Sequence, residues 1–376
     1  MKKKIAFYIE SMIVGGAEKV LIDLVNNIDP EKFDITVIAL FKKSVYSDYE
    51  FHFKEGFAGH IRYRYLIDNT HTLKYRFFNF LYNRMPKTWM YRRLVKERFD
   101  IEVAFYEGAP TEFVSYSSQP SKKIAWLHTH QERLYEGLDA RSFEKKRMEY
   151  ARYQHIIGVS EDVCSSFRAI FDYKTVKCLY NLVDEKKIFQ KVQQGSEIRY
   201  SSPFLKLVTV GRLVHVKSYD RLLNVLGQLK EDGFEFRLMM VGDGDQKADL
   251  ENLIFSKNLQ EIVTLLGHLD NPYPLICQAD CLVMSSLFEG LSTVVIESLI
   301  LETPVITTDC SGMSELIEDK QTGLICENSE EGLYNALKYV LEHPEVLAKY
   351  RHNIQGTNTV FYMSNRMQQI EKVLLN

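Results

Sequence analysis

The chain has 376 residues, 45% of them hydrophobic and 26% charged, and its formal net charge at pH 7 is -3. This length indicates about two globular domains, since a domain usually holds about 100–200 residues. The slight acidic balance argues against a nucleic-acid-binding protein, which normally carries a basic excess.

Cysteine usage and the N-terminus bear on the compartment. The six cysteines are scattered and none forms a Cys-x-x-Cys pair, so neither a zinc site nor a disulfide framework is predicted and a reducing cytoplasm is expected. Three lysines precede an apolar run at the N-terminus, but Glu10 interrupts the run and no A-x-A cleavage pattern follows. No stretch approaches the roughly 18–20 apolar residues of a spanning helix. We interpret 4–10 as a buried strand.

Short β-branched and aromatic runs alternate with longer helical patterns along the chain. In the first half the predicted strands are 4–10, 34–40, 61–66, 101–107, 122–128 and 155–160. In the second half they are 206–211, 237–242, 263–267, 281–286, 304–309 and 323–327. Continuous apolar runs suit parallel strands covered on both faces, and their alternation with helices predicts two doubly wound α/β domains.

The segment 179–203 separates the two sets of strands, because it lacks strong periodicity and is polar near its end. We place the domain boundary near Asn181. A first domain is expected over 1–180, a second over 181–356, and a helix over 357–376 that packs back on the first domain. Ligands of open α/β sheets bind at the carboxyl ends of the strands, so we expect the motifs that follow strands to line a central cleft.

The first such motif is "ESMIVGGAEKVLIDLV", in which Gly15 and Gly16 open an amphipathic helix. Glycines let the backbone approach a ligand, and a helix N-terminus favours an anion. The pattern is not Gly-x-Gly-x-x-Gly, which disfavours a nicotinamide dinucleotide. A plain strand-to-helix turn explains the motif equally well.

The second motif is "VTVGRLVHVKSYDRLL". Gly211 ends a predicted strand, and Arg212 and Lys217 lie in the loop before the next helix. Two cations at this place suit a diphosphate, because charge-assisted hydrogen bonds to phosphate are strong. Taken alone, the motif is also consistent with a solvated basic loop.

The third motif, "MVGDGDQ", contains Asp243 and Asp245 in an Asp-x-Asp arrangement. A metal ion that carries a nucleotide diphosphate is one interpretation, but no further oxygen ligands are evident. Gly-Asp-Gly is turn chemistry, and we expect Asp245 to cap the following helix. No metal site is predicted.

The fourth motif, "WLHTH", places His128 and His130 at a strand end, where alternation points both the same way. Two histidines do not make a zinc site without a third ligand. His128 therefore remains either a satisfied structural group or a residue of the cleft.

The fifth motif is "FEGLSTVVIESLILETPVITTD", in which seven uncharged residues separate Glu289 from Glu297. We expect Glu289 in the loop after a strand and Glu297 near the start of the next helix. The free amides around Ser292 and Thr293 suit a diphosphate. A carboxylate on each side would accept hydroxyl protons from a sugar and from a ribose.

Together these motifs resemble those of retaining glycosyltransferases of the GT-B fold, family 4 (glycosyl transferases group 1), of the bacterial cell-surface polysaccharide type. Residues 285–309 resemble the Glu-x7-Glu signature of that family, and "VGRLVHVKSYDRLL" and "VGDGD" resemble its preceding elements. "IVGGAEKVLIDLV" resembles its N-terminal glycine loop, and "YNLVD" resembles its interdomain hinge. The resemblance is strongest over about 205–326 and weakest over about 45–100.

The resemblance implies a role for each matching residue. The catalytic residues would be Glu289, which contacts the donor sugar, the diphosphate-binding pair Arg212 and Lys217, and His128 near the transferred sugar. The donor-binding residues would be Gly16, Gly211, Arg212, Lys217, Gly242, Gly290, Leu291, Ser292, Thr293 and Glu297. The chain departs from the family pattern at Ser292 and at Ser311-Gly312. Both positions belong to the sugar end of the pocket, which puts the donor identity in doubt.

The implied activity is that of a metal-independent, retaining hexosyltransferase without a cofactor. It would move a hexose or N-acetylhexosamine from a nucleotide diphosphate sugar, expected to be a UDP-sugar, to a glycan acceptor in capsule or other cell-surface polysaccharide synthesis. Preformed positive charge would stabilise the departing diphosphate. A sugar-nucleotide epimerase of the same fold and a non-catalytic glycosyltransferase-like partner subunit remain the alternatives.

Residues 74–99 form a local anomaly in this acidic chain, since they contain eight basic residues and one acid. The aromatic residues Phe77, Phe80 and Trp89 are among those interleaved with the cations. A basic, aromatic-rich helical stretch is typical of a segment that lies on an anionic membrane. The sequence therefore suggests a cytoplasmic enzyme, peripheral at the inner face of the membrane, whose acceptor is linked to polyprenyl diphosphate. Core aromatics with a solvated basic face are the alternative.

Overall fold

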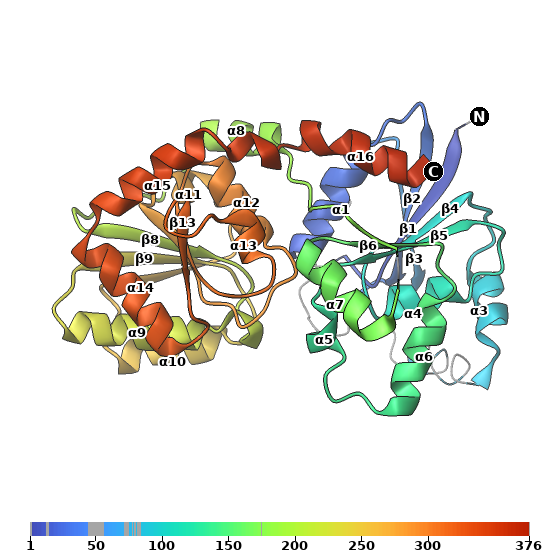
Figure 1. The fold of residues 1–376 in the computed structure, drawn as a ribbon, viewed down its shortest axis with the longest axis horizontal. Helices are drawn as coiled ribbons and strands as arrows, with labels where there is room; N and C mark the ends of the chain where they lie inside the picture. The colour runs from blue at the N-terminus through green and yellow to red at the C-terminus, as the bar shows by residue number, and fades with distance from the viewer. Residues whose placement is uncertain are drawn as a thin grey trace. The chain divides into compact units, whose positions relative to one another are not determined.

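The structure is a computed structural model that describes residues 2–12, 15–43, 56–70, 75–76, 78, 80, 84–173 and 175–375 (Figure 1). Its contacts divide the chain into two units, each built around its own sheet. Unit 1 holds Met1–Asn181 together with Met367–Asn376, and unit 2 holds Leu182–Arg366.

The sheet of unit 1 has seven parallel strands in the order β3-β2-β1-β4-β5-β6-β7. Because β1 pairs with β2 on one side and with β4 on the other, the strand order reverses beside β1. The strands are β1 Lys3–Ile9, β2 Phe33–Phe41, β3 Arg62–Ile67, β4 Ile101–Ala104, β5 Lys122–Leu127, β6 His155–Gly158 and β7 Val176–Cys178.

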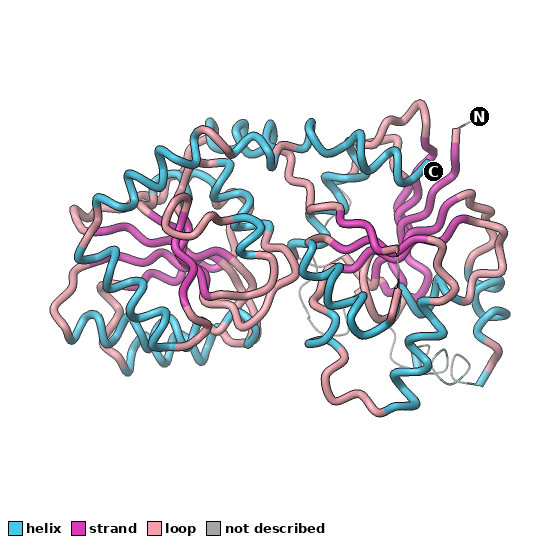
Figure 2. Tube along the Cα trace, viewed as in Figure 1, coloured by secondary structure: helices cyan, strands magenta, loops and turns pink. Residues whose placement is uncertain are grey.

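Helices cover both faces of this sheet, as the cyan segments of Figure 2 show. They are α1 Gly16–Asn27, α3 Lys87–Leu94, α4 Ala109–Ser115, α5 Gln131–Leu134, α6 Ala140–Tyr150 and α7 Glu161–Phe171. Local chemistry fixes several of their starts. In α7 the Ser160 side chain accepts a hydrogen bond from the backbone N–H of Val163, and acidic Glu161 and Asp162 occupy the first turn.

The sheet of unit 2 has six parallel strands in the order β10-β9-β8-β11-β12-β13. Its strands are β8 Leu205–Val210, β9 Phe236–Val241, β10 Val263–Gly267, β11 Cys281–Met284, β12 Val305–Thr308 and β13 Gly323–Cys326. Its helices are α8 Glu185–Gln193, η2 His215–Lys217, α9 Tyr219–Glu231, α10 Lys247–Ser256, α11 Tyr273–Gln278, α12 Thr293–Ile300, α13 Met313–Leu316, α14 Glu330–Glu342, α15 Glu345–Gln355 and η3 Asn358–Phe361.

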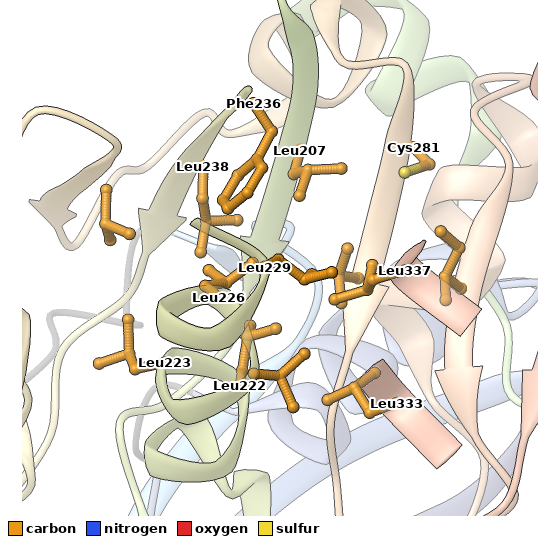
Figure 3. Close-up of a cluster of buried hydrophobic side chains, with 14 of the residues drawn as sticks. Leu207, Leu222, Leu223, Leu226, Leu229, Phe236, Leu238, Cys281, Leu333 and Leu337 are labelled. Atoms are coloured by element: carbon orange, nitrogen blue, oxygen red, sulfur yellow. The ribbon is translucent and has the colours of Figure 1, made fainter. Parts of the chain in front are cut away.

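One face of the unit 2 sheet carries a tightly packed apolar core (Figure 3). Leu222, Leu226 and Leu229 recur at helical spacing on α9, so that they form one stripe. This stripe meets Phe236 of β9 and Leu333 of α14, and none of the five side chains is exposed. Full burial of one such side chain contributes about 1.5–3 kcal/mol, so this core rigidly supports the strand ends beside it.

All twelve predicted strands are present, and the predicted GT-B class, with two parallel-sheet α/β units, is confirmed. Strand β7 was not predicted; it is a three-residue edge strand whose central residue is Lys177. The C-terminal segment also differs from the expected single helix, because η3 precedes α16 Met363–Leu375. Near the end of α16, Glu371 accepts a hydrogen bond from the backbone N–H of Asp29, and Lys122 donates to the carbonyl oxygens of residues 373 and 374.

The segment 74–99 is only partly helical. Helix α3 starts after Pro86, and Lys74, Phe77 and Leu81 lie outside the described residues. On α3 the side chain of Trp89 is 47% exposed, whereas Met90 and Tyr91 are buried. The last two therefore belong to the core of unit 1, as the alternative of core aromatics with a solvated basic face expects for them.

A buried carboxylate anchors α3 to the sheet. Glu102 of β4 is inaccessible to solvent and accepts hydrogen bonds from the hydroxyl groups of Tyr8, Tyr91, Ser117 and Ser121. Such a carboxylate is stable in the core because several donors replace its water. Through Tyr91 this network fixes the orientation of α3, and with it the exposed face that carries Trp89.

Candidate functional site

The residues predicted to hold the donor gather in unit 2, where the strand order reverses between β8 and β11. Both strands are parallel, so the loops that follow them, 211–218 and 285–292, leave the same edge of the sheet side by side. This switch point is the usual ligand site of a doubly wound sheet.

Lys217 and Glu289 come from these two loops and form an ion pair. The Lys217 Nζ lies 2.5 Å from Glu289 Oε1, and their side chains are 19% and 14% exposed. The Ser286 hydroxyl donates to the same carboxylate oxygen at 2.7 Å. Burial alone would lower the pKa of Lys217, but the charge of Glu289 and its hydrogen bond raise the pKa above its usual value. The ammonium group is therefore a permanent positive charge at this edge.

Close backbone approach brings the loop after β8 against the loop after β9. A Cβ at Gly242 would lie 1.8 Å from the carbonyl oxygen of Gly211, and the φ of Gly242 is 152°. Only glycine satisfies both conditions. The close backbone approach thus explains glycine at these positions, and it holds the start of the Arg212 loop in place.

Helix α12 begins beside the ion pair. Its N-cap is Ser292, whose side chain makes no capping hydrogen bond among the described residues, and no acidic side chain lies in the first turn. The preceding Gly290 approaches Gly312 so closely that a Cβ on the latter would meet the Gly290 carbonyl oxygen at 2.6 Å. The first turn, with Thr293, therefore presents backbone N–H groups that suit an anion.

Two polar residues that the sequence analysis missed fix the loop of Glu289. Arg221 of α9 is 9% exposed, and its guanidinium donates to the Ser285 carbonyl oxygen at 2.5 Å and to Asn328 Oδ1 at 2.9 Å. The Asn328 amide in turn donates to the carbonyl oxygens of Leu287 and Asp309. Nothing local in the sequence signals this clamp, because Arg221 and Asn328 lie 107 residues apart.

The remaining donor residues of unit 2 differ in exposure. Arg212 is exposed in the loop after β8, Leu291 is buried beside the ion pair, and Glu297 is 5% exposed inside α12. The Asp-x-Asp segment forms a turn in which Asp243 accepts from the backbone N–H of Gly244. Asp245 does not cap the next helix, which was the expectation, because Gln246 holds the N-cap position of α10.

In unit 1 the predicted glycine loop leads into α1, with Gly15 as its N-cap and Gly16 as its first residue. Ile13 and Val14, which precede the glycines, lie outside the described residues. The carboxylate of Glu18 folds over the loop, since a Cβ at Gly15 would lie 2.3 Å from Glu18 Oε2. A carboxylate thus already faces the positive end of α1.

His128 lies directly after β5 and is 8% exposed. Its ring packs on Phe105 and Tyr106, with centroid distances of 4.7 and 5.7 Å. Burial lowers the pKa of His128 to about 3, so the ring is neutral at neutral pH. His130 differs: it lies within 3.8 Å of Glu132 and Asp162.

A buried acid that the sequence analysis also missed lies beside His128. Glu107 follows β4 and is 4% exposed, and burial raises its pKa to about 7. The sequence does contain a feature that singles out Glu107, because this residue follows a buried strand as Glu289 does. The structure thus gathers the predicted donor residues within unit 2, while Gly16 and His128 lie in unit 1 at the carboxyl ends of their own strands.

Two parallel, doubly wound units with polar residues at their switch points define the GT-B class of glycosyltransferase folds. Residues 198–357 match the model of the family Glycosyl transferases group 1.

Two relatives come from Campylobacter jejuni subsp. jejuni serotype O:2. The N-acetylgalactosamine-N,N'-diacetylbacillosaminyl-diphospho-undecaprenol 4-alpha-N-acetylgalactosaminyltransferase is 34% identical over 206 residues, which span 54% of each chain. The GalNAc-alpha-(1->4)-GalNAc-alpha-(1->3)-diNAcBac-PP-undecaprenol alpha-1,4-N-acetyl-D-galactosaminyltransferase is 26% identical over 99% of this chain and 98% of its own. The first alignment thus covers about half of that relative's length.

Among solved structures, the Anabaena protein Alr3699/HepE in complex with UDP and glucose superposes with a TM-score of 0.77, at 19% sequence identity and 100% coverage of both chains. At this level of identity the similarity establishes the fold. Within the described parts of the chain, no helix is long and apolar enough to cross a membrane.

Proposed function

We propose that the protein is a retaining glycosyltransferase that moves a hexose or N-acetylhexosamine from a UDP-sugar to a glycan linked to polyprenyl diphosphate. Unit 2 binds the donor and unit 1 receives the acceptor. The observation that carries the proposal is the Lys217–Glu289 pair beside the uncapped start of α12. It offers a cation and backbone amides to a diphosphate, and a carboxylate to sugar hydroxyls, in one place.

The chemistry follows from these charges. As the bond between the sugar and the diphosphate breaks, negative charge grows on the leaving phosphate oxygen. Lys217, Arg212 and the N-terminus of α12 stabilise that charge. Their positive groups are already in place, so the protein does not have to reorganise during the reaction. A phosphate oxygen of the leaving group then takes the proton of the acceptor hydroxyl on the same face of the sugar, which retains the anomeric configuration.

The acceptor class rests on the relatives. The names of both Campylobacter enzymes specify glycans on undecaprenol diphosphate and the transfer of N-acetylgalactosamine. An N-acetylhexosamine is therefore the first donor sugar to test, and synthesis of a cell-surface polysaccharide such as a capsule is the corresponding process.

The decisive experiment is a panel of UDP-sugars tested in EDTA with an undecaprenyl-diphosphate glycan. A bound donor raises the melting temperature by mass action, because 100-fold saturation adds about 2.7 kcal/mol to stability. We expect one UDP-sugar to protect, UDP to be released, and NMR to show the anomeric configuration of the donor in the product. An altered UDP-sugar formed without acceptor would identify an epimerase, and absence of any turnover would identify a non-catalytic subunit.

We propose further that unit 1 docks on the anionic inner face of the membrane through α3 and its flanks. Trp89 is exposed on α3, and the guanidinium of Arg84 lies 4.2 Å from the ring centroid of Phe80, which is 50% exposed. Arg93 and Lys96 are also exposed. Each cation near an anionic surface contributes about 1 kcal/mol, and the exposed aromatic rings add apolar contact.

Replacement of Arg84, Arg93 and Lys96 by Glu is expected to abolish sedimentation with liposomes that contain anionic lipid. Transfer to a soluble acceptor analogue should remain, because these side chains are exposed and lie far along the chain from the donor residues. The control replaces Lys186 and Lys349, exposed cations of unit 2, by Glu. Liposome binding that survives in the first variant, or that is lost equally in the control, would refute docking through this segment.

A further inference from the structure

The turn that carries His128 is built around the buried carboxyl group of Glu107. A single oxygen, Oε1, accepts hydrogen bonds from the backbone N–H groups of His128 and Thr129, both at 2.7 Å, and from the side-chain amide of Gln131 at 2.9 Å. Three donors from one four-residue stretch thus converge on one atom. The geometry of residues 128–131 depends on that atom more than on hydrogen bonds among themselves.

The same segment after β4 also holds the imidazole ring. Phe105 and Tyr106 pack against the ring of His128, and the next residue, Glu107, holds its backbone. The ring and the main chain of His128 are therefore fixed from consecutive residues of a neighbouring strand end. The buried ring atom Nε2 of His128 has no hydrogen-bond partner among the described residues.

Among the described residues, no cation forms an ion pair with Glu107. The phenols of Tyr135 and Tyr150 are titratable groups that interact electrostatically with it. Its second oxygen, Oε2, is buried without a partner in the described part of the chain. Burying a carboxylate without a cation is costly, and burial accordingly raises the pKa of Glu107 to about 7, while the donors on Oε1 act in the opposite direction.

We propose that Glu107 is the positioning residue of His128: its buried Oε1 sets the turn 128–131 and thereby the place of the imidazole at the carboxyl end of β5. This inference rests on the proposed function, because the role of His128 in the transfer is the one that the family resemblance implies. Glu107 itself is buried and acts through His128. It is absent from the residues that the glycine, cation and Glu-x7-Glu motifs single out.

The test is a double-mutant cycle with Glu107→Ala and His128→Ala. Turnover of each variant is measured as UDP release from the donor that the wild type uses. Loss of positioning is expected to reduce turnover on the order of 10²-fold, because misplacement by about 1 Å has effects of that size. UDP binding to unit 2 should be unchanged. In the His128→Ala background the Glu107 substitution should have no further effect, since coupled residues are not additive.

Two further variants separate positioning from folding and from charge. Glu107→Gln keeps an accepting oxygen in place and should stay near wild-type turnover, whereas Glu107→Asp shortens the side chain and should behave like Glu107→Ala. The matched control is Glu136→Gln, a 73% exposed carboxyl group of the same unit. Additive losses in the cycle, or a Gln variant as impaired as the Ala variant, would overturn the proposal.

A readout independent of turnover distinguishes failure of this inference from failure of the proposed function. Nitrogen-15 NMR of labelled histidine reports the ionisation of the His128 ring, with the signal assigned by its loss in His128→Ala. The wild-type ring should stay neutral from pH 5 to 8. In Glu107→Ala the released ring should titrate near the ordinary histidine pKa of about 6.5. Identical spectra would refute the link even if no sugar were transferred.

Discussion

Lys217→Ala is expected to lower turnover by about 10²–10³-fold, the size of the loss when one preorganised charge is removed from a developing anion. The ammonium group is held by Glu289 at 2.5 Å and is only 19% exposed, so it is a fixed charge at this edge of the sheet. Its removal also leaves the half-buried Glu289 carboxylate with the Ser286 hydroxyl and without its cation. We therefore expect UDP affinity to fall together with turnover.

The measurement is UDP release under saturating acceptor, with UDP binding followed by calorimetry. Lys349→Ala removes an exposed lysine of α15 and serves as the control. Glu289→Gln provides the complementary variant: it should reduce turnover more than UDP binding, since its proposed partner is the sugar. Wild-type kinetics in Lys217→Ala would show that this edge of the sheet does not bind a diphosphate.

Arg221→Ala is the second variant with a large expected effect, although Arg221 touches no proposed ligand. Its guanidinium joins the end of β11 to Asn328, and hydrogen bonds to charged groups contribute about 1.5–3 kcal/mol each. The free energy of unfolding of unit 2 should fall by about that amount. Turnover should fall as well, because the Ser285 carbonyl oxygen that loses its donor belongs to the loop that aims Glu289. Asn328, which donates to the Leu287 carbonyl oxygen of the same loop, also loses its contact with Arg221.

Urea unfolding and UDP release, both measured well below the unfolding transition of the variant, test the two effects. Arg221→Lys should rescue little, since a single ammonium group cannot reproduce the two directions of the guanidinium fork. Arg199→Ala, at an exposed arginine of the same unit, is the control. An Arg221→Ala protein with lowered stability and normal turnover would show that the clamp supports the fold alone.

Strand positions followed from the sequence because buried parallel strands are apolar on both faces. Each such run, from 4–10 to 323–327, therefore stood out from its polar flanks. The short strand β7 did not, since it lies at the sheet edge and contains Lys177. The C-terminal helix was likewise predicted as one piece, whereas η3 precedes α16.

Residues that follow strands were also accessible to sequence reasoning, and Lys217 and Glu289 were proposed on that basis. The hydrogen bond between them could not be predicted, because 72 residues separate them and only the pairing of β8 with β11 brings their loops together. The same holds for Asn328, which lies 107 residues from Arg221. For Glu107, the position after a strand could be recognised in the sequence. The three hydrogen-bond donors that converge on its carboxyl group could not.

The sequence by itself determined the two-unit α/β architecture, the strand and helix periods, and the chemical types of the residues at the strand ends. These properties are local, because side-chain polarity and backbone preference act within a few residues. Tertiary structure alone decided which of those residues meet, which carboxyl groups are buried, and which aromatic side chains of 74–99 join the core. Those outcomes depend on pairings across long stretches of chain, where burial sets the cost of each charge and no local pattern records the partner.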